Sequence, residues 1–434
     1  MTDRQAVFYT ASELTARGKD QIPSELISGE HLIYNSPASL LFNSPGAEGY
    51  GVKRAGLSVP DSVMLLVAPG CCGRNTSLIS AMPEYHNRFF YLMMDETDLV
   101  TGRHLKKIPE AISEICDFLP EKPAAVMICI TCVDALLGTD MERVCRKAEA
   151  ECGVRVRPCY MYALTREGRK PPMVHVRQSI YSMLEPRKRD PRAVNLLGFF
   201  AGLREDSELY TLLGEAGVRT IREIGKCPDF DSYLRMSEAN FNLILHPEAR
   251  FAAEDMEKRL GIPWVELTRL YQIDKIHSQY AAFGAAIGAE LDDGAYFAEA
   301  EREIRRFRKD FGPLTIAVGE TLNADPFELS LALLRAGFQV GEIYAAPAPE
   351  QYVYLRKIAA ISPETRIYSN LEPTMLYYGE GRIPADLTVG KDASYYQPDA
   401  PNVPWNSDVQ PFGYRGVTAL FRALRSAYAG KETT

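Results

Sequence analysis

The sequence contains no apolar run of the roughly 18 residues that a membrane-spanning helix requires. It also lacks an excess of basic residues, because 49 Lys and Arg stand against 57 Asp and Glu, and the formal net charge of −8 argues against a protein that binds nucleic acid. Residues 1–7 show no basic segment followed by an apolar one, so no secretory signal is predicted. We therefore expect a cytoplasmic protein that contacts neither nucleic acid nor a membrane.

The signature motifs of several enzyme classes are missing as well. No Gly-x-x-x-x-Gly-Lys-Ser/Thr loop is present, so we do not expect the chain to hydrolyse ATP itself. No Gly-x-Gly-x-x-Gly follows a predicted strand, which argues against a self-contained nicotinamide dehydrogenase, and no nucleophile elbow indicates a Ser/His/Asp hydrolase. Cys129 and Cys132 have the spacing of half a structural zinc site, but no second pair complements them. We expect both to lie on one strand, where their thiols point to opposite faces.

Cysteine itself occurs nine times, an odd number spread along the chain. Such a set does not form a disulfide framework, and in a reducing compartment its members are thiols, metal ligands or redox groups. Cys116, Cys129 and Cys145 lie in segments with apolar periodicity. Because free cysteine is among the most buried residue types, we interpret these three as packing residues.

Apolar runs of strand length alternate with longer segments of helical periodicity along most of the 434 residues. The predicted strands are 63–67, 124–130, 194–199, 241–245, 314–319 and 386–389. The predicted helices are 105–118, 140–152, 206–217, 251–260, 296–310 and 326–337, with a further one at 417–428. This alternation predicts an α/β protein in which helices flank parallel sheets.

The chain is too long for one ordinary core, and two stretches interrupt the alternation. Residues 185–192 are charged and contain two prolines, and Gly312-Pro313 precedes the strand at 314–319. We therefore predict three Rossmann-like domains, at 1–190, 191–311 and 312–434.

Two thiols follow predicted buried strands directly: Cys72 comes after 63–67, and Cys132 comes after 124–130. Open parallel sheets bind ligands outside the carboxyl ends of their strands. Thiolates at that place are typical of iron–sulfur and other soft metal centres. The two cysteines therefore predict a thiolate-ligated metal centre.

Several segments, in collinear order over roughly residues 35 to 425, resemble the nitrogenase component 1 superfamily. Ala68-Pro-Gly-Cys-Cys-Gly-Arg-Asn75 resembles its second cluster-cysteine motif, and Ile130-Thr-Cys-Val-Asp-Ala-Leu-Leu-Gly-Thr-Asp140 resembles its third. Segments at 212–219, 239–246 and 260–264 are similar to the middle domain, and those at 320–329, 385–390 and 413–416 to the third. The superfamily contains nitrogenase molybdenum–iron protein subunits, cofactor scaffold proteins, protochlorophyllide reductase subunits and nickel-sirohydrochlorin cyclase.

This resemblance implies an α/β chain of three Rossmann-like domains that assembles with a homologous component 1 subunit as a homodimer or heterotetramer. It also implies an iron–sulfur cluster, 4Fe–4S or larger, at the subunit interface, and electrons from a separate ATP-hydrolysing iron protein. Mapped residue by residue, Cys72 and Cys132 match the second and third cluster ligands. The cluster would then relay electrons to a substrate or to a second metallocofactor.

The first cluster ligand of the superfamily has no matching cysteine, since Ser44 and Pro45 stand in its place. The extra thiol Cys71, beside Cys72, is one replacement, although a shared cluster then requires a turn at Gly70 because adjacent strand-end side chains diverge. Ser44 as an alkoxide, or ligands from the partner subunit, are the others. The sequence leaves these three possibilities open.

The resemblance also places His246 where the superfamily's catalytic subunit holds its large cofactor with a cysteine, and Trp405 lies in a segment that offers no imidazole for the second ligand. The usual ligation of that cofactor is therefore absent. We interpret His246, which ends a predicted strand, as a metal ligand or proton donor, with a satisfied structural histidine as the alternative. Arg166 is a candidate for binding an anionic substrate, and a surface or partner contact is its alternative.

We therefore predict a nitrogenase-like iron–sulfur oxidoreductase subunit that accepts low-potential electrons and reduces a small molecule or a tetrapyrrole-like substrate. Two alternatives remain. The first alternative is a non-catalytic scaffold on which a metallocluster is assembled. The second is a cluster-free partner subunit of the same family.

Overall fold

The computed structural model describes residues 5–27, 38, 51–70, 79–161, 170–379 and 381–431. They form three sheets in two compact units. The two-sheet unit consists of Glu48–Gly202 and Gly217–Thr268, and the third-sheet unit consists of Met1–Ala47, Leu203–Ala216 and Arg269–Thr434. The predicted α/β class, with parallel sheets flanked by helices, is confirmed. The predicted domain boundaries near 190 and 311 stay predictions.

The first sheet has four parallel strands in the order β3-β2-β4-β5. Their bounds are β2 (Ser62–Ala68), β3 (Phe89–Met93), β4 (Ala125–Ile130) and β5 (Arg155–Tyr160). Every residue of β2 and β4 is buried, as expected for central strands covered on both faces. Along β4, residues 125, 127 and 129 pack with helices α3 (Val52–Gly56) and α10 (Pro172–Tyr181). Residues 126, 128 and 130 pack with α7 (His104–Phe118) and α9 (Met141–Cys152).

The second sheet is also parallel, in the order β7-β6-β8-β9. Its strands are β6 (Asp190–Leu197), β7 (Thr220–Arg222), β8 (Ala239–Ile244) and β9 (Trp264–Glu266). Helix α10 packs against α13 (Arg250–Leu260), and one apolar cluster takes side chains from both sheets, among them Met127 of β4 and Ile244 of β8. Each fully buried side chain of this size contributes about 1.5–3 kcal/mol. The shared core explains why the two sheets form one unit.

The third sheet has six strands in the order β1-β12-β11-β10-β13-β14. They are β1 (Tyr9–Thr10), β10 (Thr315–Val318), β11 (Gln339–Ile343), β12 (Arg366–Ile367), β13 (Leu387–Val389) and β14 (Asn402–Val403). All are parallel except β1, which pairs antiparallel with β12. The Phe8 ring lies 5.5 Å from the Tyr368 ring and beneath the guanidinium group of Arg366. This N-terminal strand was not predicted from the sequence.

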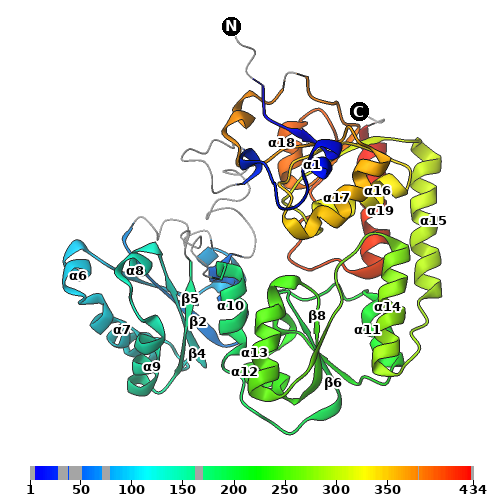
Figure 1. Cartoon of the computed structure of the whole chain (residues 1–434). Helices are drawn as coiled ribbons and strands as arrows, with labels where there is room; N and C mark the ends of the chain where they lie inside the picture. Colours follow the sequence, from blue (N-terminus) through cyan, green and yellow to red (C-terminus); the bar gives the residue numbers. More distant parts are fainter. Residues whose placement is uncertain are drawn as a thin grey trace. The chain divides into compact units, whose positions relative to one another are not determined.

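Helices of the third-sheet unit are α1 (Ala11–Arg17), α11 (Glu208–Glu215), α14 (Ile273–Ile287), α15 (Gly294–Phe311), α16 (Pro326–Arg335), α17 (Tyr352–Ile361), α18 (Lys391–Tyr396) and α19 (Gly413–Lys431). The long helices α15 and α19 pack along each other (Figure 1). At the start of α16 the carboxylate of Asp325 accepts the N–H groups of Phe327 and Glu328, and Pro326 occupies the first turn. This is the helix cap that an Asp-Pro pair predicts.

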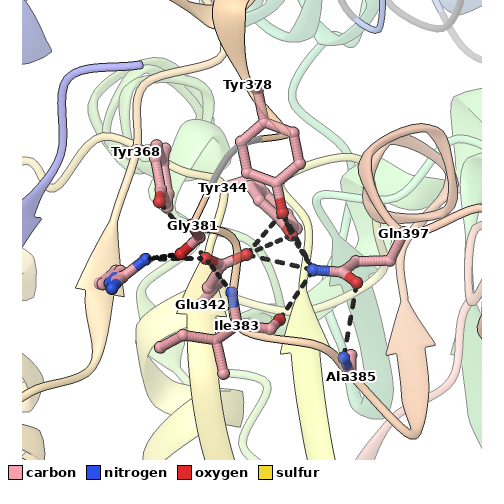
Figure 2. A network of polar contacts seen from close by, with 9 residues as sticks. Glu342, Tyr344, Tyr368, Tyr378, Gly381, Ile383, Ala385 and Gln397 are labelled. Atoms are coloured by element: carbon pink, nitrogen blue, oxygen red, sulfur yellow. Dashed lines mark hydrogen bonds and ion pairs between the residues drawn. The ribbon is translucent and has the colours of Figure 1, made fainter. Parts of the chain in front are cut away.

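A buried carboxylate organises the core of the third-sheet unit (Figure 2). Glu342 of β11 is completely buried and accepts the hydroxyl groups of Tyr344 at 2.8 Å and Tyr378 at 2.6 Å. It also accepts the backbone N–H of Ile383 at 3.0 Å and the side-chain amide of Gln397 at 3.2 Å. The network therefore joins β11 to the segments on either side of β13, with the Glu342 carboxylate as the acceptor that its donors share.

Within the described residues, no helix is long and apolar enough to cross a membrane.

Candidate functional sites at the strand ends

Each of the three sheets contains a topological switch point, where two strands side by side send their following loops in opposite directions. From β2 the chain goes to β3 on one side and later to β4 on the other; β6 is flanked in the same way by β7 and β8. In the third sheet the switch lies between β10 and β13. Loops that diverge at the carboxyl ends of such strands leave the crevice in which α/β proteins bind ligands.

The first switch point lies between the strands that precede Cys72 and Cys132. The strands β2 and β4 are paired in register, with Val67 opposite Ile130, so both end at the same edge of the sheet. Cys132 is half-buried and begins helix α8 (Cys132–Leu137). The four candidates Ser44, Cys71, Cys72 and Arg166 lie outside the described residues.

The prediction that Cys129 and Cys132 share a strand is wrong for Cys132. Cys129 is completely buried on β4, in the core that it was predicted to fill. The strand stops at Ile130, and the chain turns into α8 after Thr131, so Cys132 belongs to the helix. Cys145 is likewise buried, whereas Cys116 is half-buried.

Thr131 is a polar residue at this switch point that the sequence did not single out. Only 2% of its surface is exposed, and its Oγ1 has no hydrogen-bond partner within the part of the chain that the structure describes. Burying a hydroxyl without a partner costs about 1–3 kcal/mol. A half-buried thiol beside an unpaired hydroxyl fits a sulfur-rich metal group, because thiolate is a soft ligand and sulfur accepts hydrogen bonds. Among the described residues, no group of three or more His, Cys, Asp or Glu could hold a metal ion.

The second switch point brings His246, which follows β8, against Gly198, which follows β6. The backbone φ of Gly198 is +121°, and a Cβ atom there would lie 2.8 Å from both the Cβ and N atoms of His246, so only glycine fits. The Nδ1 atom of His246 accepts the backbone N–H of Glu248 at 3.3 Å, which requires that this nitrogen carry no proton. The imidazole also meets the Phe199 ring edge-on at 5.9 Å.

Arg177 of α10 bonds to two residues that contact His246, namely Gly198 and Glu248. Its guanidinium group donates to the carbonyl of Gly198 at 3.0 Å and to the carboxylate of Glu248 at 2.6 Å, and it lies over the Phe200 ring. Arg177 is 5% exposed, and burial lowers its pKa while Glu248 opposes that effect. This residue was not predicted from the sequence, because an arginine in an amphipathic helix normally faces solvent.

The third switch point has a buried carboxylate, Asp392, at its centre. Asp392 accepts the backbone N–H groups of Glu320 and Thr321 at 2.8 and 2.9 Å and the side-chain amide of Asn370 at 2.7 Å. A Cβ atom on Gly319 would lie 2.2 Å from its Oδ1, so glycine is required there. Both strands end in Val-Gly, at 318–319 and 389–390, and an acid follows at once as Glu320 or one residue later as Asp392; this is the signal in the sequence that could have indicated the turn.

Glu320 at this point has a strongly altered acidity. The residue as a whole is exposed, whereas its carboxyl group lies beside Asn370 and Asp392, and burial there raises its pKa to about 7. A hydrogen bond from Asn370 lowers the pKa, and the nearby Asp392 carboxylate raises it further. We therefore expect Glu320 to exchange a proton near neutral pH.

The family model described as nitrogenase component 1 type oxidoreductase matches residues 48–429. The chain belongs to this family. A solved structure of nitrogenase Cp1 at pH 6.5 superposes with a TM-score of 0.70 over 95% of this chain and 97% of that chain, at 15% identity. The overall fold predicted from the resemblance is therefore confirmed.

Curated relatives of the chain include proteins of nitrogenase cofactor biosynthesis. The nitrogenase iron-molybdenum cofactor biosynthesis protein NifE of Sinorhizobium fredii is 24% identical over 88% of this chain and 82% of that protein. The protein of the same name from Rhodobacter capsulatus is 28% identical over 51% of this chain and 49% of that protein, so this match spans about half of the relative's length. The nitrogenase molybdenum-iron protein alpha chain of Methanosarcina barkeri is 26% identical over 40% of this chain and 33% of that protein.

Proposed function

We propose that the chain is an iron–sulfur subunit of a nitrogenase-like redox protein, with its cluster at the first switch point. Cys72 and Cys132 would ligate the cluster, and Cys71, Ser44 or a homologous partner subunit would complete the ligand set. The observation that carries this proposal is the pairing of β2 with β4, which brings the segments leading to both thiols to one edge of the sheet. A cluster bound there supplies one-electron transfer at low potential.

Exposed apolar side chains beside this edge support a docking surface for an electron-donating iron protein. Leu136 and Leu137 of α8 are exposed and follow Cys132 within the same short helix. Val100 of α6 (Glu96–Thr101) is exposed on the segment that follows β3. These segments lie on either side of the strand that precedes Cys72, since β2 separates β3 from β4. Exposed apolar groups of this kind mark sites of protein association.

The docking surface is tested by placing a charge on it. In Leu136→Asp we expect a fivefold or larger loss of cluster reduction by the iron protein with ATP, with no loss of iron. Phe118→Asp is the matched control, because Phe118 is 73% exposed, against 75% for Leu136, and ends helix α7 near the opposite edge of the sheet. Equal effects of the two substitutions would contradict docking at α8.

A second candidate function, favoured by the names of the relatives, is a scaffold on which a metallocluster is assembled. His246 and Trp405 stand where the resemblance expects the cysteine and histidine of the large cofactor. The Trp405 ring nitrogen donates to the hydroxyl of Tyr271 at 2.6 Å, so this segment supplies an indole and not an imidazole. A cluster held without its usual ligands would leave more readily. His246, as ligand or proton donor, and Arg166, as contact to an anionic group, remain part of this proposal.

The cluster site is tested by anaerobic iron analysis and electron paramagnetic resonance on Cys72→Ala and Cys132→Ala. We expect each variant to lose most of its iron and its paramagnetic signal. Cys116→Ala is the matched control, because Cys116 is also half-buried, on α7 of the same unit. Full iron content in both Cys72→Ala and Cys132→Ala would disprove the site.

The two proposed functions, enzyme and scaffold, are then distinguished with protein that contains the cluster. Substrate reduction that requires both the iron protein and ATP indicates an oxidoreductase. Transfer of iron to an apo acceptor protein, without turnover, indicates a scaffold.

A further inference from the structure

Thr131 differs from two other buried threonines of the chain, Thr365 and Thr388. Thr365 is equally buried, and its hydroxyl donates to the carbonyl of Val340 at 2.8 Å; Thr388 is buried and bonds to Asn402 at 2.8 Å. Among the described residues, the Oγ1 of Thr131 has no partner, although Thr131 is only 2% exposed. Several buried polar atoms of the described residues lack partners, and Thr131 is the one directly beside a candidate metal ligand.

The place of Thr131 in the chain suggests the missing partner. It lies between the last residue of β4, Ile130, and the first residue of α8, Cys132, at the first switch point. A hydroxyl rotates freely to aim its proton, so it suits an acceptor that arrives after folding. The sulfur atoms of a thiolate-ligated cluster carry negative charge, and a hydrogen bond to a charged acceptor is about twice as strong as one between neutral groups.

We propose that the Thr131 hydroxyl donates a hydrogen bond to a sulfur of the cluster that Cys132 ligates and thereby raises its reduction potential. This inference rests on the proposed function. Reduction adds negative charge to the cluster, and a hydrogen bond to sulfur stabilises the more negative state more strongly. Thr131 is therefore a tuning residue and not a ligand.

The first test uses the protein without its cluster. Thr131→Val keeps the branched shape and removes only the hydroxyl, so we expect the variant to be as stable as wild type or more stable, because an unpaired buried group is lost. Thr365→Val is the matched control, and we expect it to be less stable, because it loses the bond to Val340. A clear destabilisation by Thr131→Val would show that the hydroxyl already has a protein or water partner, which would overturn the inference.

The second test uses the loaded protein and redox titration followed by electron paramagnetic resonance. We expect Thr131→Val to keep its iron and to reduce at a lower potential, by about a tenfold change in equilibrium constant, or ~59 mV for one electron. Thr131→Ser, which restores the donor, is expected to return toward the wild-type potential. A lower iron content in Thr131→Val that Thr131→Ser restores would also support a direct contact.

Failure of this inference is distinguishable from failure of the proposed function. If Cys132→Ala loses iron while Thr131→Val has full iron and an unchanged potential, the cluster site stands and the hydrogen bond is disproved. A loss of iron in Thr131→Val that Thr131→Ser does not restore also disproves it. If Cys132→Ala keeps all its iron, the proposed function fails, and the inference fails with it.

Discussion

Buried carboxyl groups hold much of the third-sheet unit together. Glu328 of α16 is 1% exposed and accepts the backbone N–H groups of Tyr271 and Gln272. Glu208 of α11 is equally buried and accepts the N–H groups of Tyr414 and Arg415 at the start of α19. A buried charge is costly unless hydrogen bonds compensate it, so burial raises the pKa of both groups even though each accepts several donors. Folding of this unit is therefore linked to proton binding.

The raised pKa of Glu320 predicts a pH-dependent contribution to stability. Folded Glu320 keeps its proton up to about pH 7, whereas unfolded glutamate loses it near 4.5, so the folded state binds more protons between these values. Its contribution to the free energy of unfolding is therefore full below about pH 4.5 and falls as the pH rises to about 7.

The measurement is urea unfolding of wild type and Glu320→Gln between about pH 5 and about pH 8. We expect wild type to lose stability relative to the variant as the pH rises, because glutamine does not titrate. A constant difference between the two proteins across this range would contradict the prediction.

Secondary-structure elements in the third-sheet unit are short and depend on polar contacts between them. β12 and β14 have two residues each, and β13 has three. Few ladder hydrogen bonds hold such strands, so the network around Glu342, which joins β11 to the chain before and after β13, supplies much of the connection (Figure 2).

Glu342→Leu is expected to destabilise this unit by about 3 kcal/mol or more, since it leaves several buried donors without an acceptor and such groups cost about 1–3 kcal/mol each. Tyr368→Phe is the matched comparison, because it removes the long 3.3 Å bond from the hydroxyl of Tyr368 to Glu342 and the contact of that hydroxyl with Arg366 but keeps the carboxylate, and we expect a loss of about 1 kcal/mol or less. Chemical denaturation measures both. Similar losses for the two variants would contradict a network centred on the carboxylate.

The whole chain is divided so that each compact unit contains one tryptophan. Trp264 lies on β9 in the two-sheet unit, and Trp405 follows β14 in the third-sheet unit. In chains with more than one unit, unfolding often departs from a single two-state step. The two indoles can therefore report the units separately.

Single-tryptophan variants test whether the two units unfold independently of each other. In a Trp264→Phe background, Glu342→Leu should move the fluorescence transition of Trp405 to lower denaturant concentration. In a Trp405→Phe background, the same substitution should leave the transition of Trp264 unchanged. Equal shifts in both backgrounds would mean that the units unfold together.

Strongly apolar strands could be predicted from the sequence, and short or tertiary features could not. The strands β2 and β4 were predicted because residues 63–67 and 124–130 are apolar throughout, and both strands are fully buried. The strands β7 and β9 have three half-buried residues each and carry no such pattern. The buried Arg177 was not predicted, because the hydrogen bonds that compensate its burial go to Gly198 and Glu248, which lie far from it along the chain.

For the candidate site too, the strands could be predicted from the sequence, but the exact place where a strand ends could not. The apolar runs before Cys72 and Cys132 indicated strand ends, and the pairing of β2 with β4 agrees with that reading. The exact end of β4 was not predictable, because Thr131 is compatible with either a strand or the start of a helix. The roles of Cys72, Cys71, Ser44 and Arg166 stay predictions.

The pairing of β1 with β12 has a consequence for how the protein is made. Tyr9 can pair with Ile367 only after all the chain between these two residues has left the ribosome. Contacts of such large sequence separation form slowly. Strand β1 must therefore wait, without its partner strand, until β12 has been synthesised.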